Sequence, residues 1–111
     1  MQPLNLLKIS APPINQEQLE TLIQHQHIRL QRIISPAHFR SEPYLQAEDE
    51  WVLVLQGEGT LEIEGRPLTL RAGDSLMIPA NTPHQVISTS TEPHCIWLTL
   101  HLDGGHPAVS P

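Results

Sequence analysis

The sequence is poor in basic residues, aromatic residues and cysteine. Six lysines and arginines stand against twelve acidic residues, which gives a formal net charge of −6. This charge argues against nucleic acid and anionic membrane surfaces as partners, because both attract basic proteins. The single cysteine, Cys95, cannot form an internal disulfide, and the longest apolar runs are far too short to cross a membrane. We find no basic-then-apolar leader for export, so we expect a cytoplasmic protein.

Length and composition favour one small globular domain. The chain has 111 residues, of which 39% are hydrophobic, an ordinary share for a soluble folded protein. Eleven prolines against six glycines indicate many short elements with stiff connections rather than long helices.

The first 27 residues are expected to form an arm and one short helix. Residues 1–14 carry apolar residues without clear periodicity. Residues 15–26, NQEQLETLIQHQ, start with asparagine, a favoured N-cap, and place Leu19, Leu22 and Ile23 at the i, i+3, i+4 spacing of one helix face. Such a short helix would need to dock against the rest of the domain to persist.

From about residue 28 onward the hydrophobic period changes to two, which is typical of β-strands. Breaks that contain glycine or proline separate the strand candidates, and many short strands at this spacing predict an all-β sandwich or barrel. We expect the barrel to occupy residues 28–103 and residues 104–111 to form a flexible tail. The strands are expected at residues 27–34, 50–56, 59–64, 67–71, 75–78, 84–89 and 95–102.

The stretch GDSLMIPANTPHQV, residues 73–86, has a distinctive spacing of glycine, proline and histidine. Gly73, Pro79 and His84 resemble the second motif of the cupin superfamily, G-x5-P-x-G-x2-H-x3-N, whose members are double-stranded β-helix (jelly-roll) barrels. Asn81 stands where that motif has glycine, and asparagine tolerates a left-handed backbone better than most residues. The resemblance implies an all-β cupin barrel, here preceded by the N-terminal arm and the short helix.

A second stretch resembles the end of the first cupin motif, G-x5-H-x-H-x3-4-E-x6-G. Glu50 and Gly57 match its glutamate and last glycine, while Tyr44 and Gln46 stand where its two histidines are usual. The stretch is similar to a subgroup of small single-domain bacterial cupins that carry Tyr-x-Gln-x3-Glu at this place. The resemblance spans residues 28–102.

The resemblance implies that Tyr44, Gln46, Glu50 and His84 converge on one cavity. Strand alternation puts two valines on the face of Glu50, so its carboxylate would lie at the mouth of an apolar barrel. A buried carboxylate requires a metal, a cation or several hydrogen-bond donors. Glu50 is therefore expected to have a partner, and His84 is the nearest candidate in the geometry of the family.

The identity of that partner has two alternatives. In the first, Gln46, Glu50 and His84 bind a divalent transition metal, because a mixed set of nitrogen and oxygen ligands suits Zn, Fe, Mn or Ni. In the second, the pocket is free of metal, and Glu50 is hydrogen-bonded to His84, Tyr44 and Gln46. The candidate catalytic groups are Tyr44 and His84: with a metal, Tyr44 would act as a ligand or an acid/base group, and without one, the resemblance implies His84 as base and Tyr44 as acid.

Two classes of function follow from the resemblance. The protein is either a metal-dependent dioxygenase, isomerase or lyase acting on a small organic molecule, or a non-catalytic barrel that binds or senses a small ligand without metal. The residues do not decide whether it is an enzyme. Single-domain cupins are commonly dimers, so we expect a homodimer.

The last strand candidate, residues 95–102, offers two different sides to the core. One side carries Ile96, Leu98 and Leu100, and the other carries Trp97 and His101. Aliphatic residues are the commonest occupants of a core. We therefore expect the leucine side to face inward, with Trp97 and His101 outside. In the alternative, the Trp97 side faces inward and His101 lines the rim of the pocket.

Overall fold

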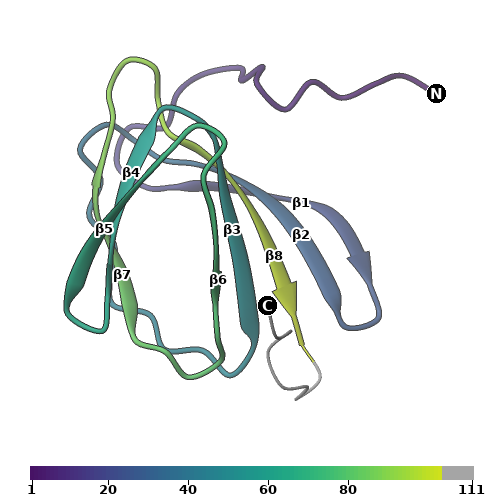
Figure 1. The fold of residues 1–111 in the computed structure, drawn as a ribbon. Coiled ribbons are helices and arrows are strands. Elements are labelled where there is room, and N and C mark those ends of the chain that lie inside the picture. Colours follow the sequence, from purple (N-terminus) through teal and green to yellow (C-terminus); the bar gives the residue numbers. More distant parts are fainter. Residues whose placement is uncertain (104–111) are drawn as a thin grey trace.

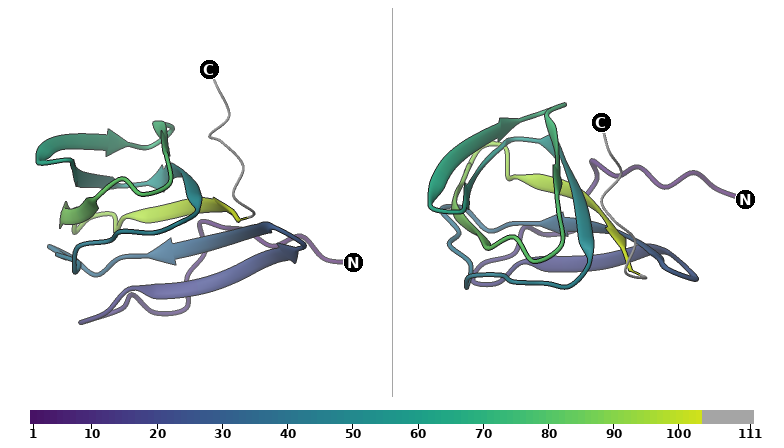
Figure 2. Two further views of the ribbon diagram at one scale, coloured as in Figure 1. Left: turned by 90° about the horizontal axis from the view of Figure 1, so that it is seen from below. Right: turned by 60° about the horizontal axis from the view of Figure 1, so that its bottom comes forward.

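The computed structural model describes residues 1–103 and consists of two antiparallel β-sheets that face each other (Figure 1). Its strands are β1 (Gln18–His25), β2 (Ile28–Ile34), β3 (Asp49–Gln56), β4 (Glu58–Ile63), β5 (Arg66–Arg71), β6 (Ser75–Ile78), β7 (His84–Thr89) and β8 (Ile96–Leu102). The five-stranded sheet has the order β1-β2-β8-β3-β6, and the three-stranded sheet has the order β5-β4-β7. Strand β1 is an edge of the larger sheet and lies away from the smaller one (Figure 2).

The strands expected from residue 28 onward are confirmed, with bounds that agree within one residue. The turns between them also follow the motif. Gly57 and Gly73 have φ angles of 77° and 93°, and Asn81 has φ 61°. This left-handed conformation explains why the motif has glycine at the position of Asn81. The tail expected at residues 104–111 lies outside the described residues.

The expected helix at residues 15–26 is wrong, because this segment forms strand β1. Strand β1 pairs antiparallel with β2, and the pairing shifts register between Thr21 and Ile23. Such a bulge interrupts the alternation of a strand. It therefore lets Leu19, Leu22 and Ile23 imitate the spacing of a helix face.

No helix long and apolar enough to cross a membrane occurs in residues 1–103.

The orientation expected for the last strand is also wrong. Strand β8 pairs with β3 so that His101 lies opposite Glu50 and Trp97 lies opposite Val54. Residues directly opposite each other on neighbouring strands point to the same face, and Val54 is fully buried in the core. Trp97 and His101 are accordingly inside, with exposed fractions of 3% and 7%.

The N-terminal arm explains how the leucine side of β8 can face outward. Arg32 of β2 lies opposite Leu98 on this outer face, and its guanidinium is held by Glu20. The same guanidinium donates to the carbonyl oxygens of Leu6 and Lys8, at 3.1 and 3.0 Å. The arm therefore crosses the outer face of the five-stranded sheet and gives it partial cover, which strand alternation alone could not reveal.

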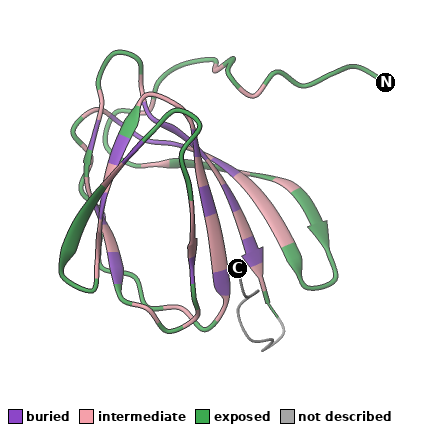
Figure 3. Ribbon diagram, in the orientation of Figure 1, coloured by how far each residue is buried: buried purple, intermediate pink, exposed green. Residues whose placement is uncertain are grey.

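The core lies between the two sheets, where the buried segments of their strands face each other (Figure 3). Trp97 is its largest member, and the ring packs on Gly59 of β4. A Cβ atom at Gly59 would lie 2.3 Å from two ring carbons of Trp97, so only glycine fits there. The other buried members are Val52, Val54, Leu61, Leu70, Ile78, Val86 and Cys95.

Candidate functional site

A cavity of about 270 Å³ opens between the two sheets. Its deeper walls are apolar and belong to the core, and polar side chains gather on its other walls. All four residues expected at the site line this cavity: Tyr44, Gln46, Glu50 and His84. The two valines expected on the face of Glu50 are also buried in the core. The structure thus brings the expected residues together.

A connecting segment brings Tyr44 and Gln46 to the cavity. At Tyr44 the segment forms a bridge with the first residue of β7, because Tyr44 N donates to His84 O at 2.7 Å and His84 N donates to Tyr44 O at 3.1 Å. The two rings lie 5.5 Å apart. Two residues on, the carbonyl oxygen of Gln46 accepts a bond from Asn81 N at 2.7 Å. These backbone bonds fix both side chains beside His84.

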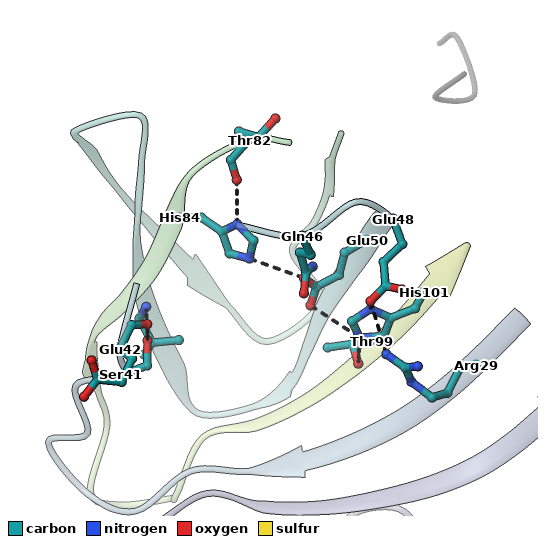
Figure 4. Close-up of polar contacts among 11 residues, drawn as sticks. Arg29, Ser41, Glu42, Gln46, Glu48, Glu50, Thr82, His84, Thr99 and His101 are labelled. Atoms are coloured by element: carbon teal, nitrogen blue, oxygen red, sulfur yellow. Dashed lines mark hydrogen bonds and ion pairs between the residues drawn. The ribbon is translucent and has the colours of Figure 1, made fainter. Parts of the chain in front are cut away.

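The carboxylate of Glu50 is the centre of the polar group (Figure 4). Gln46 Nε2 donates to its Oε1 at 2.6 Å, and His84 Nε2 lies 3.4 Å from the same oxygen. His101 Nε2 lies 3.9 Å from the other oxygen, Oε2. The Glu50 side chain is 13% exposed. This largely buried carboxylate therefore accepts a hydrogen bond from Gln46 and has two imidazoles at ion-pair distance, rather than being left unpaired.

Glu50 and His84 stabilise each other's charged form. His84 Nδ1 donates to the carbonyl oxygen of Thr82 at 2.9 Å, so Nε2 is the ring atom that faces Glu50. Burial acts to raise the pKa of Glu50, but hydrogen bonding to His84 and the charges of both histidines outweigh it, and the pKa lies below its usual range. Burial acts to lower the pKa of His84, and the bonds to Glu50 and Thr82 raise it overall.

His101 is a site residue that the sequence analysis placed outside the barrel. Its Nδ1 lies 3.1 Å from Glu48 Oε1, and Arg29 Nη2 lies 3.3 Å from the same oxygen. Because a carboxylate oxygen accepts, Nδ1 is the donor, and the Nε2 atom of His101 faces Glu50. The only signal that could have found it is the pairing register of β8 with β3, which is not local in the sequence.

Glu17 was also missed, because it was assigned to the helix. It precedes β1 and lines the same cavity. Its Oε2 accepts a hydrogen bond from Ser35 Oγ at 2.8 Å. Burial raises the pKa of Glu17, and the bond from Ser35 opposes this only in part. Burial, with the charges of Glu17 and Glu50, also raises the pKa of Tyr44, which keeps its phenol protonated.

Gln46 is not oriented as a metal ligand. In residues 1–103, no three histidine, cysteine, aspartate or glutamate side chains are grouped as a metal would require. Gln46 presents to Glu50 Oε1 its amide nitrogen, which donates, and not the amide oxygen that would ligate a metal. The expected set of Gln46, Glu50 and His84 is therefore assembled through a hydrogen bond and an ion pair, and the Gln46 amide would have to turn to bind a metal.

The comparisons with known proteins agree with this architecture. The Cupin domain family matches residues 32–101. A crystal structure from Ralstonia eutropha JMP134, of a protein provisionally named mannose-6-phosphate isomerase, is 31% identical, with a TM-score of 0.79 over 94% of this chain and 100% of that one. A cupin superfamily protein from Desulfitobacterium hafniense is 20% identical, with a TM-score of 0.74 over 93% of this chain and 100% of that one.

A protein of unknown function from Streptococcus pyogenes is 16% identical, with a TM-score of 0.73 over 94% of this chain and 96% of that one. No curated protein matches the sequence. The matched residues include both motif stretches and the whole of the polar group around Glu50. The chain belongs to the cupin family, as a small single-domain barrel.

Proposed function

We propose that the protein binds a small organic molecule in the cavity between its sheets. One observation carries this proposal: the carboxylate of Glu50 is held by Gln46, His84 and His101 at the polar side of an apolar cavity. A largely apolar pocket with a few fixed polar groups is the usual form of a small-molecule site. A cavity of about 270 Å³ suits a ligand with one ring or a short chain.

The two tryptophans provide a direct test of binding. The indole of Trp97 lines the cavity, whereas Trp51 lies on the opposite face of β3 from Glu50 and Val52. We would screen a set of small organic molecules by NMR and follow the two indole N–H signals. A ligand in the cavity is expected to shift the Trp97 signal and to leave that of Trp51 unchanged. A broad screen in which no compound moves the Trp97 signal would contradict the proposal.

Acid–base chemistry on the bound molecule is the second candidate function. The Glu50–His84 pair holds one proton between an acid and a base, and Tyr44 supplies a protonated phenol beside it. Isomerisation requires such a donor and acceptor, and the name of the Ralstonia eutropha protein supports this class of reaction. We do not extend its phosphate to this chain, because Arg29, the only lysine or arginine among the cavity-lining residues, is paired with Glu48.

A metal-dependent dioxygenase, isomerase or lyase is the alternative reading of the family resemblance. It requires the Gln46 amide, whose nitrogen donates to Glu50, to turn its oxygen toward the metal. Elemental analysis of protein purified without added metal decides this, with Glu50→Ala and His84→Ala as variants. We expect no stoichiometric transition metal in any of the three proteins. A metal present in the wild type and lost in both folded variants would support the alternative.

The assembly and location of the protein are also predictions. We expect a homodimer that acts in the cytoplasm. Light scattering coupled to size-exclusion chromatography tests the first point, with a mass twice that of the 12.4 kDa chain as the expected result.

A further inference from the structure

A second carboxylate, that of Glu17, is built into the cavity by a buried chain of hydrogen bonds. Trp97 Nε1 donates to Ser35 Oγ at 2.8 Å, and Ser35 Oγ lies 2.8 Å from Glu17 Oε2. An indole N–H can only donate, so the single proton of the Ser35 hydroxyl is committed to Glu17. Ser35 is 0% exposed and Trp97 is 3% exposed. This support holds the Glu17 carboxylate in one place as an acceptor.

The charge of Glu17 has no partner within the described residues. No lysine, arginine or histidine in residues 1–103 forms an ion pair with it, and Ser35 is its only hydrogen-bond donor there. Its Oε1 therefore has unused acceptor capacity at the cavity wall. A half-buried carboxylate in this state lacks the compensation that such groups normally have.

The other charged groups of the cavity are already paired. Glu50 is surrounded by Gln46 and two imidazoles. Arg29 is paired with Glu48 through Nη2, and its buried Nε has no hydrogen-bond partner among the described residues. Glu17 is thus the carboxylate of the cavity that has no cationic partner within residues 1–103, and an ammonium group can supply one. The indole of Trp97, which supports Glu17 through Ser35, also lines the cavity and offers an aromatic surface.

From these contacts we propose that the ligand is a small organic amine, whose ammonium group donates to Glu17 while its apolar body lies against the core wall. Charge-assisted hydrogen bonds are about twice as strong as neutral ones, and a cation gains further from an adjacent indole. The proposal rests on the proposed function, because it names the class of molecule that the cavity would bind. Glu17 is in this account the residue that determines specificity.

A matched pair of probes tests the proposal on the intact chain. Benzylamine and benzyl alcohol have nearly the same shape, and only the first is a cation at about pH 7.5. We would measure the affinity of each by NMR titration of the Trp97 indole signal. The proteins are the wild type, Glu17→Gln, and the control Glu64→Gln, which makes the same change at an exposed turn residue. Glu17→Gln keeps an oxygen that accepts from Ser35, so the fold is expected to persist.

The expected result has three parts. The wild type binds benzylamine at least about tenfold more tightly than benzyl alcohol. Glu17→Gln loses this preference and keeps its affinity for benzyl alcohol. Glu64→Gln behaves like the wild type.

Two results would overturn the proposal and are distinguishable from each other. Equal affinity of the wild type for both probes, unchanged in Glu17→Gln, would refute the amine and leave the ligand cavity standing. Failure of both probes to shift the Trp97 signal, together with a blank result in the broad screen, would refute the ligand cavity itself and the amine with it.

Discussion

Glu50 and Glu17 line the same cavity, yet the two carboxylates behave in opposite ways. Burial is the largest influence on both, and it acts to raise the pKa of each. The pKa of Glu50 is nevertheless lowered, because Gln46, His84 and His101 supply donors and positive charge. The pKa of Glu17 is raised, because Ser35 is its only donor among the described residues.

This difference shows that burial alone does not set the proton affinity of a cavity carboxylate. The number and charge of the donors decide it. Three side chains from three segments of the barrel, Gln46, His84 and His101, approach Glu50, and its charge is satisfied within the protein. The charge of Glu17 is left for a molecule from outside. The following predictions test this contrast, from the largest expected effect to the smallest.

The largest difference is expected between the two amide substitutions. Glu50→Gln removes the carboxylate that faces the His84 imidazolium, and hydrogen bonds to charged groups contribute about 1.5–3 kcal/mol. We expect a loss of about 2 kcal/mol in the free energy of unfolding, measured with urea at about pH 6. Glu17→Gln keeps the bond from Ser35, so its effect should stay within about 0.5 kcal/mol. Equal losses of unfolding free energy in the two variants would show that Glu50 and Glu17 are not held differently by their partners.

Ser35→Ala should weaken the support of Glu17. The substitution leaves the buried Trp97 N–H without its acceptor and Glu17 without its donor. An unsatisfied buried donor costs about 1–3 kcal/mol, so we expect a loss of about 1–2 kcal/mol and a shift of the Trp97 indole signal. The exposed residue Ser88 is the matched control, and Ser88→Ala should change stability by less than about 0.5 kcal/mol. A Ser35→Ala protein as stable as this control would show that the hydrogen bonds from Trp97 to Ser35 and from Ser35 to Glu17 do not stabilise the fold.

The two glutamates should also give opposite pH dependence of stability. The folded pKa of Glu50 is below the ordinary 4.5, so its contribution is present above pH 4.5 and is lost as pH falls through the lowered pKa. The folded pKa of Glu17 is above 4.5, so its contribution is full below pH 4.5 and is lost as pH rises through the raised pKa. Glu50→Gln should remove the loss of stability that the wild type shows as pH falls below 4.5. Glu17→Gln should remove the loss of stability that the wild type shows as pH rises above 4.5. Urea unfolding across this range measures both slopes.

His84 limits the stability of the fold at higher pH. Its folded pKa is raised above the ordinary 6.5, so its contribution is full below pH 6.5 and is lost as pH rises through the raised pKa. The Glu50–His84 pair should therefore stabilise the fold most between pH 4.5 and 6.5. In His84→Gln the decline above pH 6.5 should be absent, and an unchanged decline would assign it to another group.

The smallest effect is expected for His101→Gln. The contact between His101 Nε2 and Glu50 is long, 3.9 Å, whereas His84 Nε2 lies at 3.4 Å. Interactions weaken steeply beyond hydrogen-bond distance, so we expect a loss of less than about 1 kcal/mol in the same urea assay. A loss as large as that of Glu50→Gln would mean that the contacts of His101 with Glu48 and Glu50 together contribute as much as the contacts of the Glu50 carboxylate.

The sequence predicted the parts of the molecule that depend on local spacing. The strands from β2 to β8 follow alternation and turn residues, and the motif spacing brought Tyr44, Gln46, Glu50 and His84 to one cavity. Strand β1 was predicted as a helix because a bulge gave its apolar residues a helical spacing. That error also removed Glu17 from consideration.

The remaining errors arose from contacts between distant segments. Both sides of β8 are partly apolar, and only its register with β3 places His101 opposite Glu50. The N-terminal arm, held by Arg32, covers the face that alternation predicted to be inside. Ser35 and Trp97 are 62 positions apart, and no local pattern connects them to Glu17. Pairing register and long-range hydrogen bonds were therefore beyond the reach of spacing arguments.

The contrast between the two carboxylates can be measured directly by an NMR titration of glutamate side-chain carboxyl carbons. Glu17→Gln and Glu50→Gln assign the two signals by their disappearance. The account predicts a pKa below 4.5 for Glu50 and above 4.5 for Glu17. The reverse order, or equal values near 4.5, would contradict the claim that donors rather than burial determine the order of the two pKa values.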